Sequence, residues 1–250
     1  MAQTAPAPHR ASIVEGGVVY KQNLSEFVKE DSKVFFAATD RNKEAILEQL
    51  RPYLADAVQV LEIGSGSGQH IYHFAREFPG VVFQPTEYDT SLFTSIEAYT
   101  NDLLSQGHNV HINKPLELDA TDAAHWEVIE RAGRDLPQSE GKYDLVLTTN
   151  VFHITPWIVG QSIVRGAGRV LKSGGLFLLY GAFKRDGKFN TESNAQFDQT
   201  LRGRDASWGV REINDIAAVA ETEAHMQLLE VRDMPSNNYL LIFQKVDLEE

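Results

Sequence analysis

The chain of 250 residues contains no cysteine. This absence excludes disulfide bonds, thiolate metal ligands and a cysteine nucleophile. No segment approaches the roughly 20 apolar residues that a membrane-spanning helix needs. Residues 1–10, rich in Ala and Pro, lack the apolar core of a secretory signal. We therefore expect a cytoplasmic protein that does not bind membranes.

Runs of basic residues are also missing. The chain has 23 Lys and Arg residues against 35 Asp and Glu residues, for a formal net charge of −12. Because an acidic surface repels the phosphate backbone, we do not expect nucleic acid as a partner. The histidines show no zinc spacing, and the predicted strand ends lack the grouped carboxylates of a catechol-type Mg²⁺ site, so no metal is expected. The sequence does not indicate an oligomeric state.

The most informative segment follows the apolar run at residues 58–61. It starts with Glu62 and continues with Gly64, Gly66 and Gly68 at alternate positions. Glycine has no Cβ, so such a turn can be tight and a ligand can lie against its backbone amides. The spacing departs from the G-x-G-x-x-G pattern of dinucleotide sites and from the phosphate loop, which needs a lysine. It favours S-adenosylmethionine (SAM), whose cationic amino group suits the carboxylate of Glu62.

Three further strands are predicted to end in polar residues suited to the same ligand. Glu87 ends the second strand, where doubly wound folds place an acid that accepts hydrogen bonds from ribose hydroxyls; Asp89 is a nearby alternative. Asp119 ends the third strand and is expected to accept the adenine amino group. Asn150 ends the fourth strand, at the edge where we expect catalysis.

The pattern of helices and strands predicts an α/β fold. Apolar strands alternate with helices, which is typical of a parallel sheet covered on both faces, and a Pro/Asn turn joins the last two strands into a hairpin. We expect a Rossmann-like class I methyltransferase fold, with a seven-stranded, mostly parallel sheet and an antiparallel C-terminal hairpin strand. The expected helices cover residues 40–50, 69–78, 91–106, 122–133, 157–171 and 213–224, and the later strands residues 81–86, 110–116, 143–149, 176–182, 226–232 and 239–245.

The domain organisation is predicted to be simple. Residues 1–30 form an N-terminal extension, partly flexible, with a helix starting at about Ser25. Residues 31–250 form one SAM-dependent methyltransferase domain. Asp40 is expected to cap the helix that precedes the glycine segment.

Several motifs resemble those of a known family. They are the segments 41–44, 61–70, 83–87, 150–157, 179–183, 193–198, 208–211 and 234–238. With these motifs, the chain from about Phe35 to Lys245 resembles the methyltransferase-like protein 26 family, within the class I SAM-dependent methyltransferases. Ala182 stands where that family leads us to expect proline, and Ser236 where we expect alanine. The resemblance implies the fold and SAM as the cofactor, but no particular acceptor.

Methyl transfer from a sulfonium is an in-line displacement, which needs the nucleophile aligned with the methyl carbon at ~3 Å and water excluded. His153 follows the fourth strand and is our candidate general base, because imidazole has a suitable pKa. The alternative is that His153 shapes its loop through hydrogen bonds to the backbone. Arg41 and Asn42 are expected to close over the SAM carboxylate, which an Arg fork binds through both oxygens.

A second group of residues is predicted to contact the acceptor. Phe152 and Trp157 are candidates for the pocket wall, with a place in the core as the alternative. Asn194, Asp198 and Arg202 lie on a segment in a usual lid position and are candidates for orienting a polar acceptor, with a solvated lid face as the alternative. Two further sites, at Arg211 and residues 237–238, are interpreted as stabilisers of the hairpin and turn.

The sequence thus predicts a SAM-dependent methyltransferase that modifies an O or N nucleophile of a small molecule. Two alternatives keep the fold: an enzyme that catalyses a cyclisation or isomerisation, and a SAM-binding protein without catalysis. An NAD-dependent oxidoreductase is the remaining rival, disfavoured by Glu62 and by the C-terminal hairpin.

Overall fold

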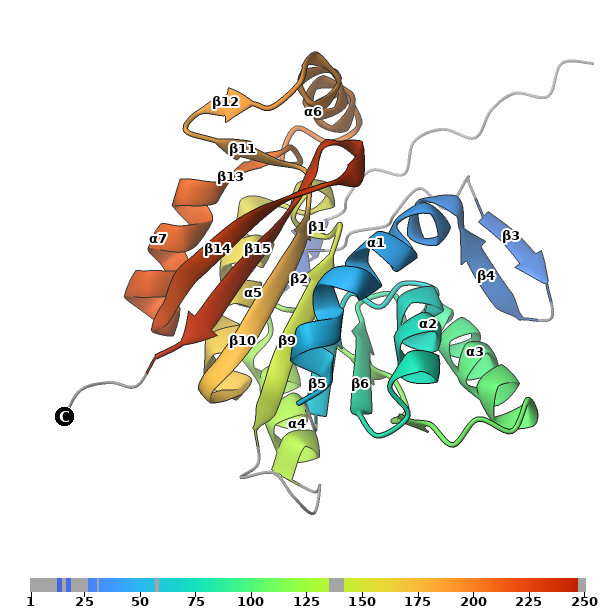
Figure 1. Ribbon diagram of the computed structural model, residues 1–250. Helices are drawn as coiled ribbons and strands as arrows, with labels where there is room; N and C mark the ends of the chain where they lie inside the picture. The colour runs from blue at the N-terminus through green and yellow to red at the C-terminus, as the bar shows by residue number, and fades with distance from the viewer. Residues whose placement is uncertain are drawn as a thin grey trace, which may run out of the picture.

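The computed structural model describes residues 13–14, 17–18, 27–30, 32–56, 59–134 and 142–246. Within this part of the chain, one sheet forms the centre of the molecule, in the order β14-β15-β10-β9-β5-β6-β7 (Figure 1). An eighth strand, β8, pairs with β6 on the same side as β7. The strands of this sheet are β5 (Gln59–Ile63), β6 (Val82–Glu87), β7 (His111–Ile112), β8 (Leu116–Glu117), β9 (Tyr143–Thr149), β10 (Leu171–Gly181), β14 (Met226–Met234) and β15 (Asn238–Lys245).

Strand β15 runs antiparallel to both of its neighbours, β10 and β14. The pairs from β10 to β7 are all parallel. The predicted third strand is split into β7 and β8, which pair with different parts of β6. The predicted fold class, a mostly parallel sheet with an antiparallel strand from the C-terminal hairpin, is therefore confirmed.

The described residues contain seven α-helices. They are α1 (Ala37–Leu54), α2 (Gln69–Glu77), α3 (Phe93–Ser105), α4 (Ala123–Arg134), α5 (Trp157–Val170), α6 (Glu192–Arg204) and α7 (Ile213–Ala224). Short 3₁₀ turns lie at η1 (Thr90–Leu92), η2 (Phe152–Ile154) and η3 (Pro235–Asn237). Six of the seven helices match predicted helices, and α6 is the one that the apolar pattern missed, because few of its side chains are buried.

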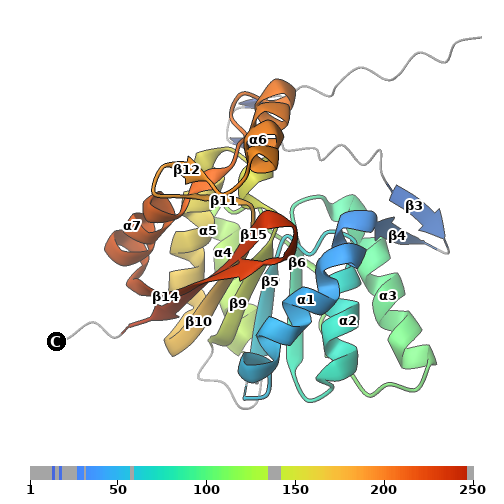
Figure 2. The same cartoon turned by 45° about the horizontal axis from the view of Figure 1, so that its top comes forward.

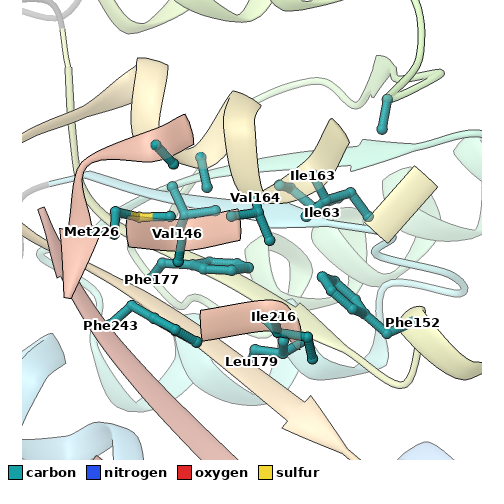
Figure 3. Close-up of a cluster of buried hydrophobic side chains, with 14 of the residues drawn as sticks. Ile63, Val146, Phe152, Ile163, Val164, Phe177, Leu179, Ile216, Met226 and Phe243 are labelled. Carbon is teal, nitrogen blue, oxygen red and sulfur yellow. The ribbon is translucent and has the colours of Figure 1, made fainter. Parts of the chain in front are cut away.

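The sheet separates two hydrophobic cores, because successive side chains of a strand point to opposite faces. On one face, Val60 and Leu145 pack with α1, α2 and α3. On the other face, Leu61 and Val146 pack with α4, α5 and α7. Figure 3 shows this second core, in which Phe177 and Phe243 stack with ring centroids 5.9 Å apart. The helices thus cover both faces and leave the carboxyl edge of the parallel strands for the loops.

A small lid lies beyond that edge (Figure 2). It consists of α6 and a three-stranded sheet in the order β12-β11-β13, with β11 (Phe183–Arg185), β12 (Lys188–Phe189) and β13 (Arg211–Glu212). Its own apolar cluster contains Ala182, Leu201, Trp208 and Val210. The lid is therefore built around a separate small core.

The N-terminal part of the chain differs from the sequence predictions at two points. A strand, β3 (Phe27–Glu30), pairs with β4 (Lys33–Phe36) where we expected a helix starting near Ser25; the pairing with β4 overrides the weak helical pattern. Asp40 does not cap α1, which begins after Phe36, and it pairs with Lys43 instead. The remaining two strands, β1 (Ile13–Val14) and β2 (Gly17–Val18), pair with each other. The predicted flexibility of the extension falls mostly outside the described residues, as do residues 247–250.

Candidate functional site

The glycine loop joins β5 to α2 and is fixed to the neighbouring strand. The backbone N–H groups of Gly64 and Ser65 both donate to the carbonyl oxygen of Thr86, at 3.0 and 2.9 Å. Gly68 has a φ of +91°, and a Cβ there would lie 2.9 Å from Cα of Ile96 on α3. This position therefore requires glycine on two grounds, its backbone conformation and the close approach of a helix.

Glu87 ends β6 directly beside this loop. Its Oε2 accepts the N–H of Gly66 at 2.7 Å, and its Oε1 accepts the N–H of Asp89 at 3.0 Å. Burial raises the pKa of the Glu87 carboxyl, and the backbone hydrogen bonds oppose that shift. Each carboxylate oxygen can still accept another hydrogen bond. Asp89, the alternative, caps Ser91 through its Oδ1 and lines the same pocket as Glu87, but of the two only Glu87 is bonded to the glycine loop.

A first pocket extends from Glu87 toward α5. Its polar lining includes Glu87, Asp89 and Asp119, and its apolar lining includes Leu118 and Ile163. Oδ1 of Asp119 accepts hydrogen bonds from the N–H and hydroxyl of Thr121, at 2.8 and 2.6 Å, so this turn engages Oδ1 and not Oδ2. A largely apolar pocket with carboxylates in its lining offers the contacts that a purine and its sugar take.

A second pocket adjoins the first, because Gly64, Val151 and Ile154 line both. It is bounded by the start of α1, the glycine loop, the ends of β9 and β10, α6 of the lid and the turn of the C-terminal hairpin. Its lining includes Phe36, Arg41, Asn42, Gly66, His70, Asn150, His153, Tyr180, Phe197, Ser236 and Asn238. The two pockets share part of their wall and together form the hollow along the carboxyl edge of the sheet, where ligands bind in open α/β folds.

Asn150 adopts a φ of +59°, in the left-handed region that Asn tolerates better than most residues. Its N–H donates to the carbonyl oxygen of Tyr180 at 2.9 Å, which ties the end of β9 to the end of β10. Asn150 thus shapes the turn at which the chain leaves β9 toward α5.

Glu62 lies behind the glycine loop and lines neither pocket. Its side chain is 1 % exposed, and the Ser65 hydroxyl opposes the effect of burial on the pKa of its carboxyl. The His70 ring lies beside it, with Nδ1 4.0 Å from Oε1. Burial raises the pKa of Glu62 to about 7. The predicted contact with a cationic group therefore needs that group to reach past the loop toward His70.

His153 is buried in the 3₁₀ turn η2 and lines the second pocket. Its Nδ1 has no hydrogen-bond partner, and its ring meets Phe197 edge-on with centroids 5.2 Å apart. Burial, with the neighbouring Arg211 cation, lowers the pKa of His153 to about 4. The ring is therefore neutral at pH 7. Its carbonyl oxygen also accepts the N–H of Gly209 at 3.0 Å, which joins this turn to the lid.

The structure places the predicted acceptor residues outside both pockets. Phe152 is 1 % exposed and belongs to the core, as Figure 3 shows, and Trp157 packs against the same core. Asn194 donates to Asn190 and to the carbonyl oxygen of Asn237. These side chains support the walls of the hollow instead of facing it.

Asp198 and Arg202 likewise hold the lid together. Asp198 accepts the N–H of Val210 at 2.7 Å through Oδ1 and pairs with Arg202 at 2.8 Å through Oδ2. The adjacent Phe197 reaches the pocket instead, because neighbouring residues of a helix point to different sides. Arg211 stabilises a turn, in line with its interpretation, by donating to the carbonyl oxygens of Phe152, Thr155 and Ser207.

The residues that sequence reasoning missed are polar and aromatic side chains facing the second pocket. They are Phe36, His70, Thr149, Tyr180, Phe197 and Asn238. Thr149 and Tyr180 lie at strand ends beside Asn150, so their positions at that edge were the available signal. Across residues 32–246 as described, no group of three or more His, Asp or Glu side chains could hold a metal ion.

Solved structures with the same fold include several methyltransferases. An O-methyltransferase family protein from Burkholderia thailandensis has a TM-score of 0.61 at 18% identity, over 85% of this chain and 60% of that chain. Mitomycin 7-O-methyltransferase MmcR has a TM-score of 0.63 at 15% identity, over 84% and 56%. Human N-acetylserotonin methyltransferase, in complex with SAM, has a TM-score of 0.60 at 12% identity, over 84% and 53%. These likenesses show that the fold is that of a class I methyltransferase.

Sequence comparisons add a distant relative and a family. Highly reducing polyketide synthase 2 of Gibberella zeae is 28% identical over 168 residues, which cover 61% of this chain and 6% of the synthase. The chain thus matches only a small part of that protein, and little more than half the length of the solved structures. The model of the family DUF938, described as a protein of unknown function, matches residues 33–245. The chain therefore belongs to the DUF938 family.

Proposed function

We propose that this protein binds SAM along this hollow and transfers its methyl group to an O or N nucleophile of a small molecule. The observation that carries the proposal is the placement of Glu87, which lines the first pocket while its carboxylate accepts the N–H of Gly66, a glycine-loop residue that lines the second. Neighbours of the same fold support it, since human N-acetylserotonin methyltransferase holds SAM and PigF holds S-adenosylhomocysteine (SAH).

In this proposal the first pocket takes the adenosine. Glu87 accepts hydrogen bonds from the ribose hydroxyls, and Asp119 accepts one from the adenine amino group. Gly64 leaves room for the side chain of Val151, which an added Cβ would approach to 2.6 Å, and Gly68 allows α2 to start close against α3. SAM supplies an electrophilic methyl group on a sulfonium.

The second pocket then takes the amino-acid end of SAM together with the acceptor. Arg41 and Asn42 line it from α1 and are placed for the carboxylate. The ammonium group lies toward Glu62, whose carboxyl ionises as the cation arrives. Asn150 shapes the turn beside the sulfonium.

The acceptor lies against the lid, between His153 and the ring of Phe197. Because His153 is neutral at pH 7, it can take a proton or a hydrogen bond from an acceptor hydroxyl or amine. A pKa of about 4 makes it a weak base, which favours orientation of the acceptor over full proton removal. The pocket lining that the structure describes holds the cation Arg41 and no carboxylate, so a neutral or anionic acceptor fits better than a cationic one.

We also propose that residues 31–250 act as one methyltransferase domain, of the kind found in the methyltransferase-like protein 26 family, working in the cytoplasm without nucleic acid. No helix among the described residues is long and apolar enough to cross a membrane.

The test is transfer of label from methyl-labelled SAM to a small-molecule extract, separated from protein and nucleic acid. We expect labelled small molecules and an equal amount of SAH with the wild type, and much less of both with Glu87→Gln at a SAM concentration near the wild-type Kd. SAM that binds and is not consumed would contradict transfer and favour a binding protein. SAM consumed without label in any acceptor would favour a reaction other than methyl transfer.

A further inference from the structure

Five polar side chains form a connected row under the second pocket. The row consists of Thr149 at the end of β9, His70 on α2, Asn42 on α1, Tyr180 at the end of β10 and Asn238 at the start of β15. All five line the pocket. The side chains of Thr149, Tyr180 and Asn238 point to the sheet face that α1 and α2 cover, because they share the alternation of the core residues on that face. The row therefore connects helices and strands that are far apart in sequence.

The contacts along the row are short. Thr149 Oγ1 lies 3.2 Å from His70 Nδ1, and His70 Nε2 lies 2.9 Å from Asn42 Oδ1. At the other end, Asn238 Nδ2 donates to Tyr180 Oη at 2.9 Å. Asn42 also hydrogen-bonds the Tyr180 phenol, and both amides lower its pKa against the rise that burial causes.

The chemistry of these groups gives the row a direction. His70 is 5 % exposed, and burial lowers the pKa of its ring to about 3, so the ring is neutral and carries one proton. An amide oxygen can only accept, so that proton belongs on Nε2, facing Asn42. Nδ1 then accepts the hydroxyl proton of Thr149. With its oxygen held by His70, Asn42 turns its NH₂ group toward Tyr180.

Two donors remain for the pocket once these bonds are counted. An Asn NH₂ group has two protons and a Tyr hydroxyl has one. One Asn42 proton goes to Tyr180 Oη, which also receives the proton from Asn238. The second Asn42 proton and the Tyr180 hydroxyl proton are left over. Arg41, exposed in the same lining, has no carboxylate partner among the described residues. A carboxylate, which has only acceptors, can accept from all three.

We infer that His70 is a positioning residue: protonated at Nε2, it fixes the Asn42 amide so that Asn42 and Tyr180 donate, beside Arg41, to the carboxylate of the cofactor's amino-acid end. The inference rests on the proposed function, because it takes SAM as the cofactor. It gives His70 a role other than metal binding. His70 acts through Asn42 and need not touch the carboxylate itself.

The test compares two ligands by calorimetry. SAH carries the amino-acid end, whereas 5′-methylthioadenosine has the same adenosine and sulfur without it. We expect His70→Leu to weaken SAH binding about tenfold, as for the loss of hydrogen bonds to a charged group, and to leave methylthioadenosine binding unchanged. His70→Gln, whose amide can still donate to Asn42, should restore most of the SAH affinity.

The matched control is His73→Leu. His73 is also buried on α2, but its Nε2 faces Glu44 at 3.3 Å, and it lines neither pocket. This variant should bind both ligands like the wild type. Nitrogen-15 NMR of the ligand-free protein, with His70 signals assigned by their loss in His70→Leu, should show a neutral ring protonated at Nε2.

A ring protonated at Nδ1, an equal loss for both ligands in His70→Leu, or no loss at all would overturn the inference while leaving the proposed function standing. A wild type that binds neither ligand would overturn the proposed function, and this inference with it.

Discussion

Glu62 offers the sharpest link between burial and a measurable property. In the folded chain, burial of its carboxyl raises the pKa from 4.5 to about 7, although the Ser65 hydroxyl opposes the rise. In the unfolded chain the same group loses its proton near 4.5. Between these two values the folded state holds a proton that the unfolded state has released, so the free energy of unfolding falls as pH rises.

The size of this effect follows from the shift. At 1.36 kcal/mol for each pKa unit, the ligand-free wild type should lose about 3 kcal/mol of stability between pH 4.5 and 7 from this one group. Glu62→Gln removes the titration, and its amide adds an offset that does not depend on pH. The variant should therefore gain about 3 kcal/mol on the wild type over that range.

Urea unfolding of both proteins at half-unit steps from pH 4.5 to 8 measures the difference directly. The quantity to compare is the change in the gap between the two proteins, which cancels all other titrating groups. A gap that stays constant with pH would show that Glu62 titrates alike in both states, and would refute the argument from burial.

Two further predictions concern the loop and the lid. Gly68→Ala should destabilise the fold by about 1–3 kcal/mol in urea unfolding, because its backbone conformation and the approach of Ile96 both disfavour a side chain. The control is Gly80→Ala, which has nothing within 4 Å of the added Cβ. An equal loss of stability in both variants would contradict this prediction. Phe197→Ala should leave SAM affinity within twofold of the wild type and reduce the rate of methyl transfer about tenfold, because the Phe197 ring orients the acceptor beside His153. A loss confined to SAM affinity would contradict the placement of Phe197 beside the acceptor.

The fold could be predicted because its signals are local and repeated. Strands β5, β6 and β9 are largely apolar runs of about the length that a buried strand needs, and each leads into a helix. Parallel strands bring their carboxyl ends to one edge, so Glu87, Asp119 and Asn150 meet along one hollow although they lie far apart in sequence. The same edge rule would have added Thr149 and Tyr180.

The acceptor side could not be predicted because it depends on which way adjacent residues face. Phe152 enters the core while His153 faces the pocket, one position apart in a 3₁₀ turn. On α6, Phe197 reaches the pocket while Asp198 bonds within the lid. Glu62 shows the same limit, since its position beside the glycines suggested a ligand contact and the structure places it behind the loop. Such choices are made by packing between distant segments, which a residue pattern does not encode.

The central claim is that SAM binds in the hollow beside Glu87, and calorimetry of SAM binding tests it most directly. The wild type should bind with micromolar affinity. Glu87→Gln should bind at least about tenfold more weakly, because it loses a charged acceptor for the ribose hydroxyls. Glu117→Gln, which alters an exposed acid on the adjoining strand β8, should match the wild type. No binding by the wild type, or equal binding by Glu87→Gln, would contradict the account.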